Sequence, residues 1–161
     1  MSLDIFIKTK QIIKPISTSF RLATLQDLDE ILAIELRAYQ QPWNKQKFID
    51  SFDNVNTQIQ LILVDKKIAG YLLTLQSVEF IDILNICIDP KFQQQGLGKQ
   101  LLDNLLKHQQ GSAINSLLLE VRKSNITAIS FYQHYGFKLI DMRKKYYSNG
   151  EDAKILRLQI T

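Results

Sequence analysis

The residues with the clearest chemical potential form a turn between a strand and a helix. Residues 86–90 read Ile-Cys-Ile-Asp-Pro, and residues 93–99 read Gln-Gln-Gln-Gly-Leu-Gly-Lys. Pro90 cannot join a strand ladder, and the leucines after Gly98 have helical spacing. The first turn of a helix has unpaired N–H groups and a positive dipole end, and glycine lets an anion approach the backbone. The turn is therefore a candidate cradle for a pyrophosphate.

Two familiar nucleotide motifs do not fit this turn. A P-loop needs glycine where Gln93 stands and serine or threonine where Gln100 stands. A dinucleotide-binding fingerprint needs a third glycine where Leu101 stands. An ordinary strand–helix turn with two structural glycines remains the alternative interpretation of residues 96–98.

A second group of interest is a carboxylate at the end of another strand. Glu120 follows the apolar run Leu117–Leu119, whose lack of alternation is typical of a strand with a parallel neighbour. We expect this strand to lie beside residues 86–88, so that Ile88 and Glu120 end at the same sheet edge, where such sheets bind ligands. Glu120 could act there as a general base. The alternative is a solvated glutamate paired with Arg122.

The remaining elements must hold that edge in place. A stripe of apolar residues predicts a helix over residues 25–38, and Asn44 is the expected N-cap of a shorter second helix. A later helix is expected over residues 125–134, with Ser124 at its start and Gly136 as the C′ residue after its end. The order βααβββαβαββ predicts an α/β fold with a mixed, mostly antiparallel central sheet flanked by helices. The other expected elements are strands 20–22, 58–64, 68–75, 80–88, 115–121, 137–146 and 153–159, and a helix over 98–109.

Length and composition limit the class of protein. The 161 residues suit a single domain over 17–161, preceded by an irregular leader over 1–16. The net charge of +4 is too weak to favour nucleic-acid binding. Neither a membrane span nor a signal peptide is visible. The single cysteine excludes an internal disulfide and favours a cytoplasmic setting.

The turn belongs to a wider pattern with a known parallel. Gln93-x-x-Gly96-x-Gly98, after a strand that ends in Asp-Pro, resembles the coenzyme A signature of the GNAT acetyltransferase superfamily. Residues 119–137 read Leu-Glu-Val-Arg-x-Ser-Asn-x-x-Ala-Ile-x-x-Tyr-x-x-x-Gly-Phe. This stretch resembles the RimI-type enzymes of that superfamily, which acetylate the N-terminal alanine of a small-subunit ribosomal protein. The resemblance covers about residues 18–160 and implies the GNAT fold.

The resemblance also implies roles for individual residues. The acetyl donor would be bound by the backbone of Ile86, Cys87 and Ile88, by the pyrophosphate turn Gln94, Gln95, Gly96, Leu97, Gly98 and Lys99, and by Asn125. Glu120 would accept a proton and Tyr132 would donate one. The peptide would be held by Arg143, Tyr146 and Tyr147. Trp43, in a loop that resembles the family's substrate loop, is either a wall of the peptide groove or a packing anchor.

The reaction implied is direct attack of an amine on the thioester of acetyl-CoA in a ternary complex. An α-amino group has a pKa of about 7.7–8.0 against about 10.4 for lysine, so one carboxylate is an adequate base for it. A tyrosine hydroxyl suits the leaving thiolate, although Tyr132 could instead be a core aromatic, as Tyr135 is expected to be. A β-bulge at residues 86–88 would free an N–H for the oxyanion. Cys87 fits a small buried residue better than a nucleophile.

These observations predict an acetyl-CoA-dependent N-acetyltransferase that acts on a protein N-terminus, with a small-subunit ribosomal protein as the expected partner. An acetyltransferase for a small amine or a lysine side chain is the alternative within enzymes. A coenzyme A-binding module without catalysis is the alternative outside them. Because His108 and His134 are isolated, the sequence gives no metal-ligand spacing.

Overall fold

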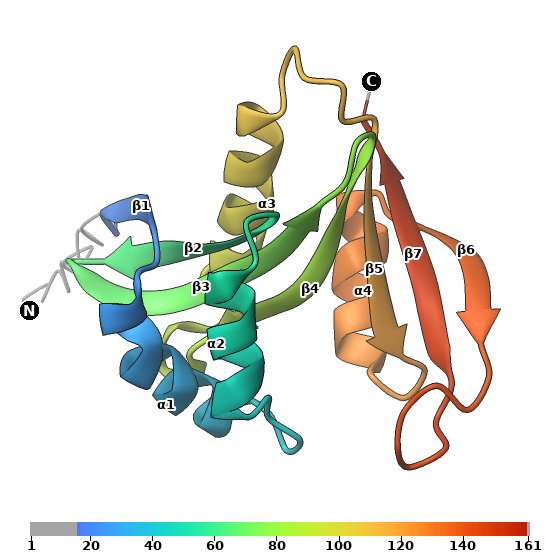
Figure 1. The fold of residues 1–161 in the computed structure, drawn as a ribbon, viewed down its shortest axis with the longest axis horizontal. Coiled ribbons are helices and arrows are strands. Elements are labelled where there is room, and N and C mark those ends of the chain that lie inside the picture. Colours follow the sequence, from blue (N-terminus) through green and yellow to red (C-terminus); the bar gives the residue numbers. More distant parts are fainter. Residues whose placement is uncertain (1–15, 161) are drawn as a thin grey trace, which may run out of the picture.

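A seven-stranded sheet organises the molecule (Figure 1). The computed structural model describes residues 16–160, so the expected leader lies, apart from Ile16, outside the described residues. The strand order is β1-β2-β3-β4-β5-β7-β6, and every neighbouring pair is antiparallel except β4 and β5. The expected mixed, mostly antiparallel sheet is confirmed. The strands are β1 (Thr18–Leu22), β2 (Thr57–Val64), β3 (Lys67–Gln76), β4 (Phe80–Ile88), β5 (Ser116–Arg122), β6 (Lys138–Arg143) and β7 (Ala153–Gln159).

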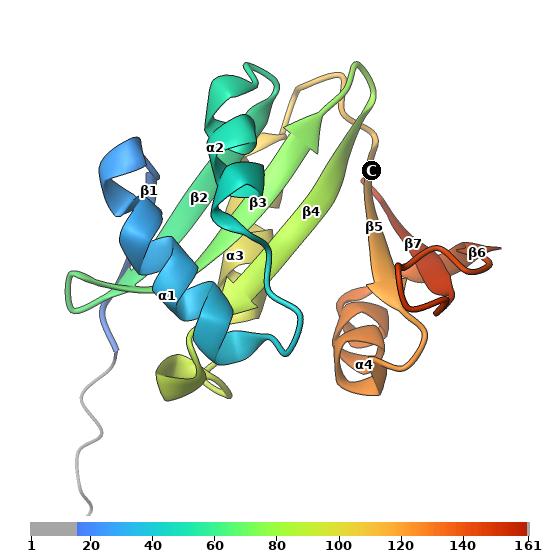
Figure 2. The ribbon, with the colours of Figure 1, turned by 60° about the horizontal axis from the view of Figure 1, so that its bottom comes forward.

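Helices cover both faces of the sheet (Figure 2). On one face α1 (Leu28–Ala38) and α2 (Lys45–Asp53) pack on β2, β3 and the end of β4. On the other face α3 (Leu97–His108) and α4 (Ile126–Tyr135) pack on a second apolar cluster. Alternation in β2 serves both layers, because Ile59, Leu61 and Leu63 face α1 while Ile62 and Val64 face α3. No helix within residues 16–160 is long and apolar enough to cross a membrane.

The first helix differs in detail from the expected one. Its first turn, Leu25–Asp27, is a 3-10 helix that starts with a capping box between Thr24 and Asp27. Leu25 and Leu36 belong to the apolar stripe that predicted this helix, but they are 59% and 66% exposed and lie outside its buried face. The buried face of α1 instead runs through residues that recur every three or four positions: Leu28, Ile31, Ile34 and Glu35.

The parallel strands β4 and β5 form a fork. They pair over four residues each, Phe80–Ile83 with Ser116–Leu119, and then diverge (Figures 1 and 2). Residues 84–88 are called the β4 arm, and residues 120–122 the β5 arm. The expectation that residues 86–88 lie beside β5 was therefore wrong, because the ladder ends before them.

The predicted β-bulge exists but lies earlier in β4. Leu73 is opposite Asn85 while Thr74 is opposite Ile83, so Leu84 is the extra residue. The bulge falls directly after the last residue that pairs with β5, where β4 can bend without losing ladder bonds on that edge. It turns the side chains of Asn85 and Cys87 toward α1.

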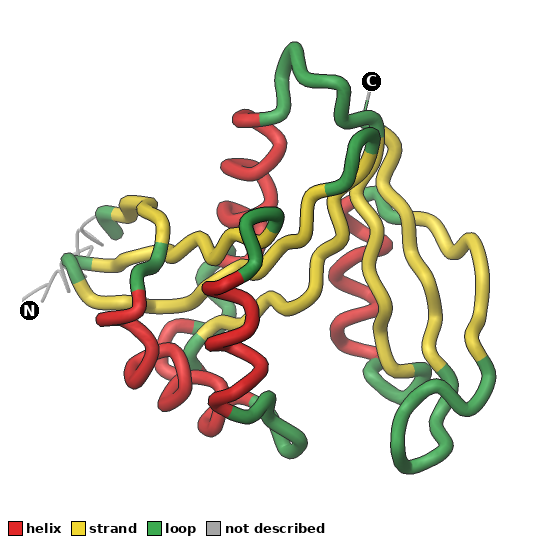
Figure 3. The backbone as a smooth tube through the Cα atoms, in the orientation of Figure 1, coloured by secondary structure: helices red, strands yellow, loops and turns green. Residues whose placement is uncertain are grey.

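Two element ends also differ from expectation. Asn125, not Ser124, caps α4, and its Oδ1 accepts a hydrogen bond from the Ala128 N–H at 3.1 Å. The sixth strand ends at Arg143 instead of residue 146. There Lys145 adopts a φ of +51°, and its N–H donates to Asp152. The loop between β6 and β7 lies at the open end of the fork (Figure 3).

Candidate active site

The open edge of the β4 arm carries backbone groups that no strand pairs. The N–H of Asp89 donates to the Ala69 carbonyl at 2.8 Å, so this end of β4 is in register with β3. In an antiparallel ladder alternate residues point to opposite edges. The backbone groups of Cys87 therefore face β3, and those of Ile86 and Ile88 face the fork. The expectation that the Cys87 backbone binds the acetyl donor was wrong, because the ladder with β3 uses it.

Two side chains occupy the carbonyl oxygens on this edge. The Tyr39 hydroxyl donates to the Ile86 carbonyl, and the Gln93 Nε2 donates to the Ile88 carbonyl at 3.1 Å. Burial, and to a lesser extent the nearby Cys87 and Tyr132, raise the pKa of Tyr39, so its phenol remains a proton-bearing donor. The fork edge consequently presents N–H groups, which suit the oxygen of a carbonyl or an oxyanion.

The glycine turn leaves the start of α3 uncapped. Gly96 is the N-cap residue with a φ of +75°, and it has no side chain to bond the first-turn N–H groups. By contrast, Asn44 and Asn125 cap α2 and α4 through their side chains. The space around Gly96 is open, with no atom within 4 Å of where a Cβ would stand. This arrangement fits an anionic pyrophosphate.

Lys99 contributes less directly to this turn. Its ammonium pairs with Asp103 at 2.7 Å, one helical turn along α3. Asp103 also accepts a hydrogen bond from the Tyr135 hydroxyl at 2.7 Å. Tyr135 thus packs beside α3 and away from the fork, in agreement with its expected packing role.

Glu120, on the β5 arm, is held by the hairpin that follows. Its carboxylate pairs with Arg143 at 2.5 Å, and the side chain is 29% exposed. A hydrogen bond to Glu120 is the main cause of the raised pKa of Tyr146. The alternative pairing with Arg122 was wrong, since Arg122 binds Glu151 at 3.1 Å. Arg143 and Tyr146 therefore both lie beside Glu120, so three residues that were assigned to one site are close together.

A second carboxylate near Glu120 was missed by the sequence reasoning. Asp82 is opposite Leu118 in the parallel ladder, which places it on the same face of the sheet as Glu120, two residues further along β5. Burial and then the Glu120 charge raise the pKa of Asp82, and Arg143 opposes them. Within residues 16–160 its carboxylate has no hydrogen bond or ion pair. The carboxylates of Asp82 and Glu120 and the guanidinium of Arg143 thus lie near one another at the fork.

Tyr132 reaches the fork from α4. It is 7% exposed, and its hydroxyl has no hydrogen-bond partner in the described part of the chain. Burial raises its pKa, and its effect on the pKa of Tyr39 places the two phenols near each other. Tyr132 also packs against Phe131 and Phe137. It is therefore both a core aromatic and a hydroxyl close to the β4 arm.

The remaining assigned residues have structural partners of their own. The Oδ1 of Asn125 is used as the α4 cap, which leaves its amide N–H groups for a ligand. The ring of Trp43 packs on Phe48 with centroids 5.6 Å apart, and its backbone N–H donates to Glu35 at 2.8 Å. Tyr147 lies under the Arg122 guanidinium at 3.8 Å.

Cys87 is not a nucleophile in this arrangement. Its side chain is 2% exposed, and burial, with Glu35 as a further cause, raises the pKa of the thiol to about 12. A thiol with that pKa is protonated at neutral pH. The interpretation as a small buried residue is the one its surroundings support.

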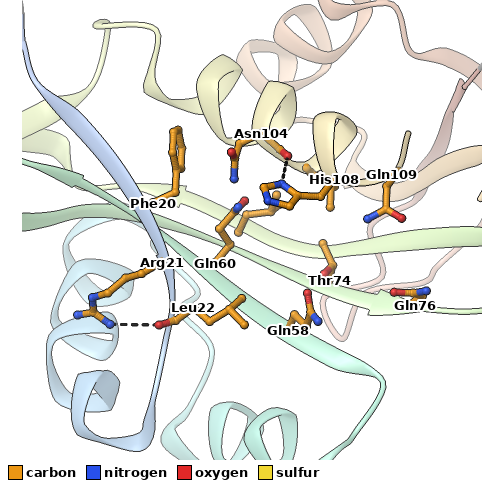
Figure 4. A pocket seen from close by; sticks show the side chains of 12 residues that line it. Phe20, Arg21, Leu22, Gln58, Gln60, Thr74, Gln76, Asn104, His108 and Gln109 are labelled. Atoms are coloured by element: carbon orange, nitrogen blue, oxygen red, sulfur yellow. Dashed lines mark hydrogen bonds between the residues drawn. The ribbon is translucent and has the colours of Figure 1, made fainter. Parts of the chain in front are cut away.

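A cavity of about 700 Å³ lies elsewhere, between β1–β3 and the second half of α3 (Figure 4). Its polar lining is mainly uncharged: Gln58, Gln60, Thr74, Gln76, Asn104 and Gln109. Its one cationic side chain, Arg21, is paired with Asp27 at 2.7 Å. This end of α3 is opposite the Gly96 turn, and the cavity lacks a carboxylate that could accept a proton from an amine.

Three residues of the site escaped prediction as chemical groups. They are Glu35, Tyr39 and Asp82. For Glu35 a signal existed, because it falls four residues after Ile31 and seven after Leu28, on the buried stripe of α1. A carboxylate in that position needs buried partners. For Tyr39 and Asp82 the sequence carried no such signal.

Comparison with known proteins agrees with this geometry. Residues 28–137 match the acetyltransferase (GNAT) family. The [ribosomal protein bS18]-alanine N-acetyltransferase of Salmonella typhimurium is 33% identical over 138 residues, which cover 84% of this chain and 93% of that protein.

Solved structures give the same result. The ribosomal-protein-S18-alanine N-acetyltransferase from Escherichia coli superposes with a TM-score of 0.82 at 31% identity, over 90% of this chain and 95% of that one. A GNAT family acetyltransferase from Elizabethkingia anophelis, solved with acetyl-CoA bound, shares the fold with a TM-score of 0.71 at 23% identity, over 89% and 98% of the two chains. The chain therefore belongs to the GNAT family and is an acetyl-CoA-dependent N-acetyltransferase.

Proposed function

We propose that this enzyme transfers acetyl from acetyl-CoA to the N-terminal alanine of a small-subunit ribosomal protein of the bS18 type. The observation that carries the proposal is the fork, with the Glu120 carboxylate on one arm and an edge of backbone N–H groups on the other. The substrate is suggested by the relatives from Salmonella typhimurium and Escherichia coli, which are named for the acetylation of an alanine of ribosomal protein bS18. With such a substrate the reaction would take place in the cytoplasm. A single catalytic domain over residues 17–161 would carry it out.

The acetyl donor would lie along the β4 arm. The N–H groups of Ile86 and Ile88 suit the thioester oxygen and the pantetheine carbonyls, and the uncapped start of α3 suits the pyrophosphate. Asn125 has amide N–H groups left for the pantetheine arm. Acetyl-CoA, when bound, would supply the activated thioester, and the other roles would fall to side chains of this chain.

The acceptor amine must be neutral before it attacks. With a pKa of about 7.7–8.0, an α-amino group is roughly one-tenth neutral at pH 7, whereas a lysine is almost wholly charged. Glu120 would take the departing proton, either directly or through one water molecule. Its ion pair with Arg143, at 2.5 Å, fixes the direction of the carboxylate. These conditions favour an N-terminus over a lysine side chain.

Tyr132 would serve the leaving sulfur. Burial keeps its hydroxyl protonated, so it can donate a hydrogen bond to the thiolate that forms when the C–S bond breaks. Because a tyrosine with a raised pKa is a weaker acid than a thiol, stabilisation by a hydrogen bond is favoured over full proton transfer. Arg143, Tyr146, Tyr147 and the Trp43 loop would hold the peptide.

The test is acetyl transfer to two peptides, measured by mass spectrometry. One begins with alanine followed by the start of a bS18-type protein, and the other has a blocked N-terminus and one free lysine. Transfer to the first peptide alone supports the proposal. Transfer to the second alone identifies a lysine acetyltransferase. If neither accepts acetyl, a small-amine substrate or a non-catalytic coenzyme A-binding role becomes the better hypothesis.

A further inference from the structure

A buried carboxylate lies behind the fork, outside the proposed catalytic groups. Glu35 of α1 is 1% exposed. Its Oε1 accepts the Trp43 backbone N–H at 2.8 Å, and its Oε2 accepts the Asn85 amide at 3.2 Å and the Tyr71 hydroxyl. The same Asn85 amide also donates to the Tyr71 oxygen at 3.1 Å. In each of these hydrogen bonds Glu35 is the acceptor, so both of its oxygens are held by donors from the described residues.

The partners of Glu35 come from the two surfaces that the reaction must bring together. Asn85 is the first residue of the β4 arm after the bulge, one residue before the edge that faces the fork. Trp43 lies in the loop between α1 and α2, on the side proposed for the peptide. The two oxygens of one rigid carboxyl group therefore tie the acetyl-donor strand to the peptide loop.

Further contacts in the same region make the connection stiff. Arg37 and Tyr39, which follow Glu35 at alternate positions, bind the Asp89 carboxylate at 2.5 Å and the Ile86 carbonyl. In the middle of the loop, Gln41 accepts a hydrogen bond from Arg122 of the β5 arm at 2.6 Å. A displacement of the β4 arm can thus be transmitted to the loop through direct contacts between protein groups.

Stability alone does not account for a carboxylate at this position. Removing a charge from water is costly, and well-packed apolar residues often serve as well as buried polar ones. The neighbours on the buried stripe of α1, Ile31 and Ile34, show the side chain that packing alone would select. A carboxyl group, unlike an apolar side chain, holds two hydrogen-bond donors in fixed positions relative to each other.

We propose that Glu35 is a positioning residue that couples acetyl-CoA binding to peptide binding, so that each substrate strengthens the binding of the other. The inference rests on the proposed function for the identity of the peptide, but not for the coupling itself. Coupling between two sites is reciprocal and is typically about 5–150-fold in affinity. Glu35 would carry it by holding the Trp43 loop in its binding position when the β4 arm is occupied.

Trp43 allows a direct test because it is the single tryptophan of the chain. Coenzyme A is titrated into the wild type, Glu35→Gln and Glu30→Gln while tryptophan fluorescence is recorded; calorimetry measures coenzyme A binding separately. Glu30 is an exposed residue of the same helix, so its variant is the matched control. We expect a saturable fluorescence change in the wild type and in Glu30→Gln. In Glu35→Gln we expect coenzyme A to bind with no such change.

The second measurement is the affinity for the alanine-starting peptide with and without saturating coenzyme A. The wild type should bind the peptide at least about fivefold more tightly with coenzyme A present, and Glu35→Gln should bind it equally in both conditions. In steady state, Glu35→Gln should raise the KM for the peptide and leave kcat within about twofold. If Glu35 were merely structural, Glu35→Gln would lower kcat, kcat/KM and the melting temperature together.

Each outcome decides the question. A wild-type fluorescence change retained in Glu35→Gln, or absent from the wild type, overturns the coupling. If Glu35→Gln does not fold, Asn85→Leu cuts the link on the strand side and should abolish the same change. Failure of the peptide to bind or react overturns the proposed substrate instead, because the fluorescence titration needs no peptide.

Discussion

The two arms of the fork are built in opposite ways. The β4 arm turns buried side chains, Asn85 and Cys87, toward α1 and offers its backbone to the fork. The β5 arm offers side chains, Glu120 and Arg122, whose partners lie on a hairpin that is largely exposed. A fixed backbone edge suits the invariant acetyl donor, and adjustable charged side chains suit a protein acceptor.

The difference also predicts how each arm tolerates change. Exposed ion pairs such as Glu120–Arg143 contribute about 0–1 kcal/mol to stability, so their loss should change catalysis without unfolding the protein. The β4 arm is held by buried contacts from α1, and the loss of these contacts should lower both catalytic activity and stability. The following variants test this contrast, from the largest expected effect on activity to the smallest.

Glu120→Gln should lower kcat by roughly 10²–10⁴, the usual contribution of a general base. The amide keeps the shape of the side chain but cannot accept the amine proton. Steady-state kinetics measures kcat, and calorimetry measures the affinity for acetyl-CoA, which should not change. Glu79→Gln, in an exposed turn, is the control. An unchanged kcat in Glu120→Gln would remove Glu120 from its proposed role.

Tyr132→Phe should lower kcat by about tenfold, since one hydrogen bond contributes about 0.5–1.5 kcal/mol. The packing against Phe131 and Phe137 is preserved in this variant, so the melting temperature should stay near that of the wild type. Tyr135→Phe loses a hydroxyl bond to Asp103 away from the fork and should keep full activity. Equal losses in the two variants would contradict the assignment.

Arg37→Gln should weaken the β4 arm itself. Burial is the largest single cause and raises the pKa of Asp89, but the hydrogen bonds from Arg37 and the Lys91 N–H, with the charges of both residues, together hold the pKa below its ordinary value. We expect a several-fold higher KM for acetyl-CoA and a loss of about 1–3 kcal/mol in the free energy of unfolding at pH 7.

The pH dependence of Arg37→Gln follows from that shift. A lowered carboxyl pKa gives stability above the unfolded pKa of about 3.9, which is lost as the pH falls through the folded value. The stability difference between Arg37→Gln and the wild type should therefore shrink below about pH 4, as measured by denaturation at several pH values. A gap that persists into acid would show that packing, and not the ion pair, is the cause.

Asp82→Asn should have the smallest effect, a rise of about threefold in the KM for the peptide, because one charge that attracts the substrate ammonium is removed. Its effect on stability has the opposite sign to that of Arg37→Gln. A raised carboxyl pKa means that stability present below about pH 3.9 is lost as the pH rises. The variant should thus be more stable than the wild type at pH 7 and equal to it near pH 3.

Much of the fold followed from sequence patterns, because alternation and the glycine turn are local signals. The strands β2, β3 and β4 and the helix α3 appear within a few residues of their expected ends. The length of the β4–β5 ladder was not predictable, because nothing at Leu84 marks the bulge as glycine or proline would.

The site could be predicted where chemistry follows sequence motifs and not where it depends on distant contacts. Glu120 and Arg143 were each assigned, but their pairing joins strands β5 and β6 across β7 and is a property of the sheet. Likewise, Tyr39 reaches the Ile86 carbonyl across 47 residues of sequence. Contacts of that kind depend on tertiary register, which local propensity does not encode.

The shortness of the β4–β5 ladder has a mechanical consequence. Four residues on each strand supply the sheet's connection between a half built from β1–β4 with α1–α3 and a half built from β5–β7 with α4. A ligand bound in the fork would contact both halves and hold them together. At 100 times its dissociation constant such a ligand adds about 2.7 kcal/mol to folding stability. The enzyme should therefore become most resistant to unfolding and amide exchange at the moment when it is loaded for reaction.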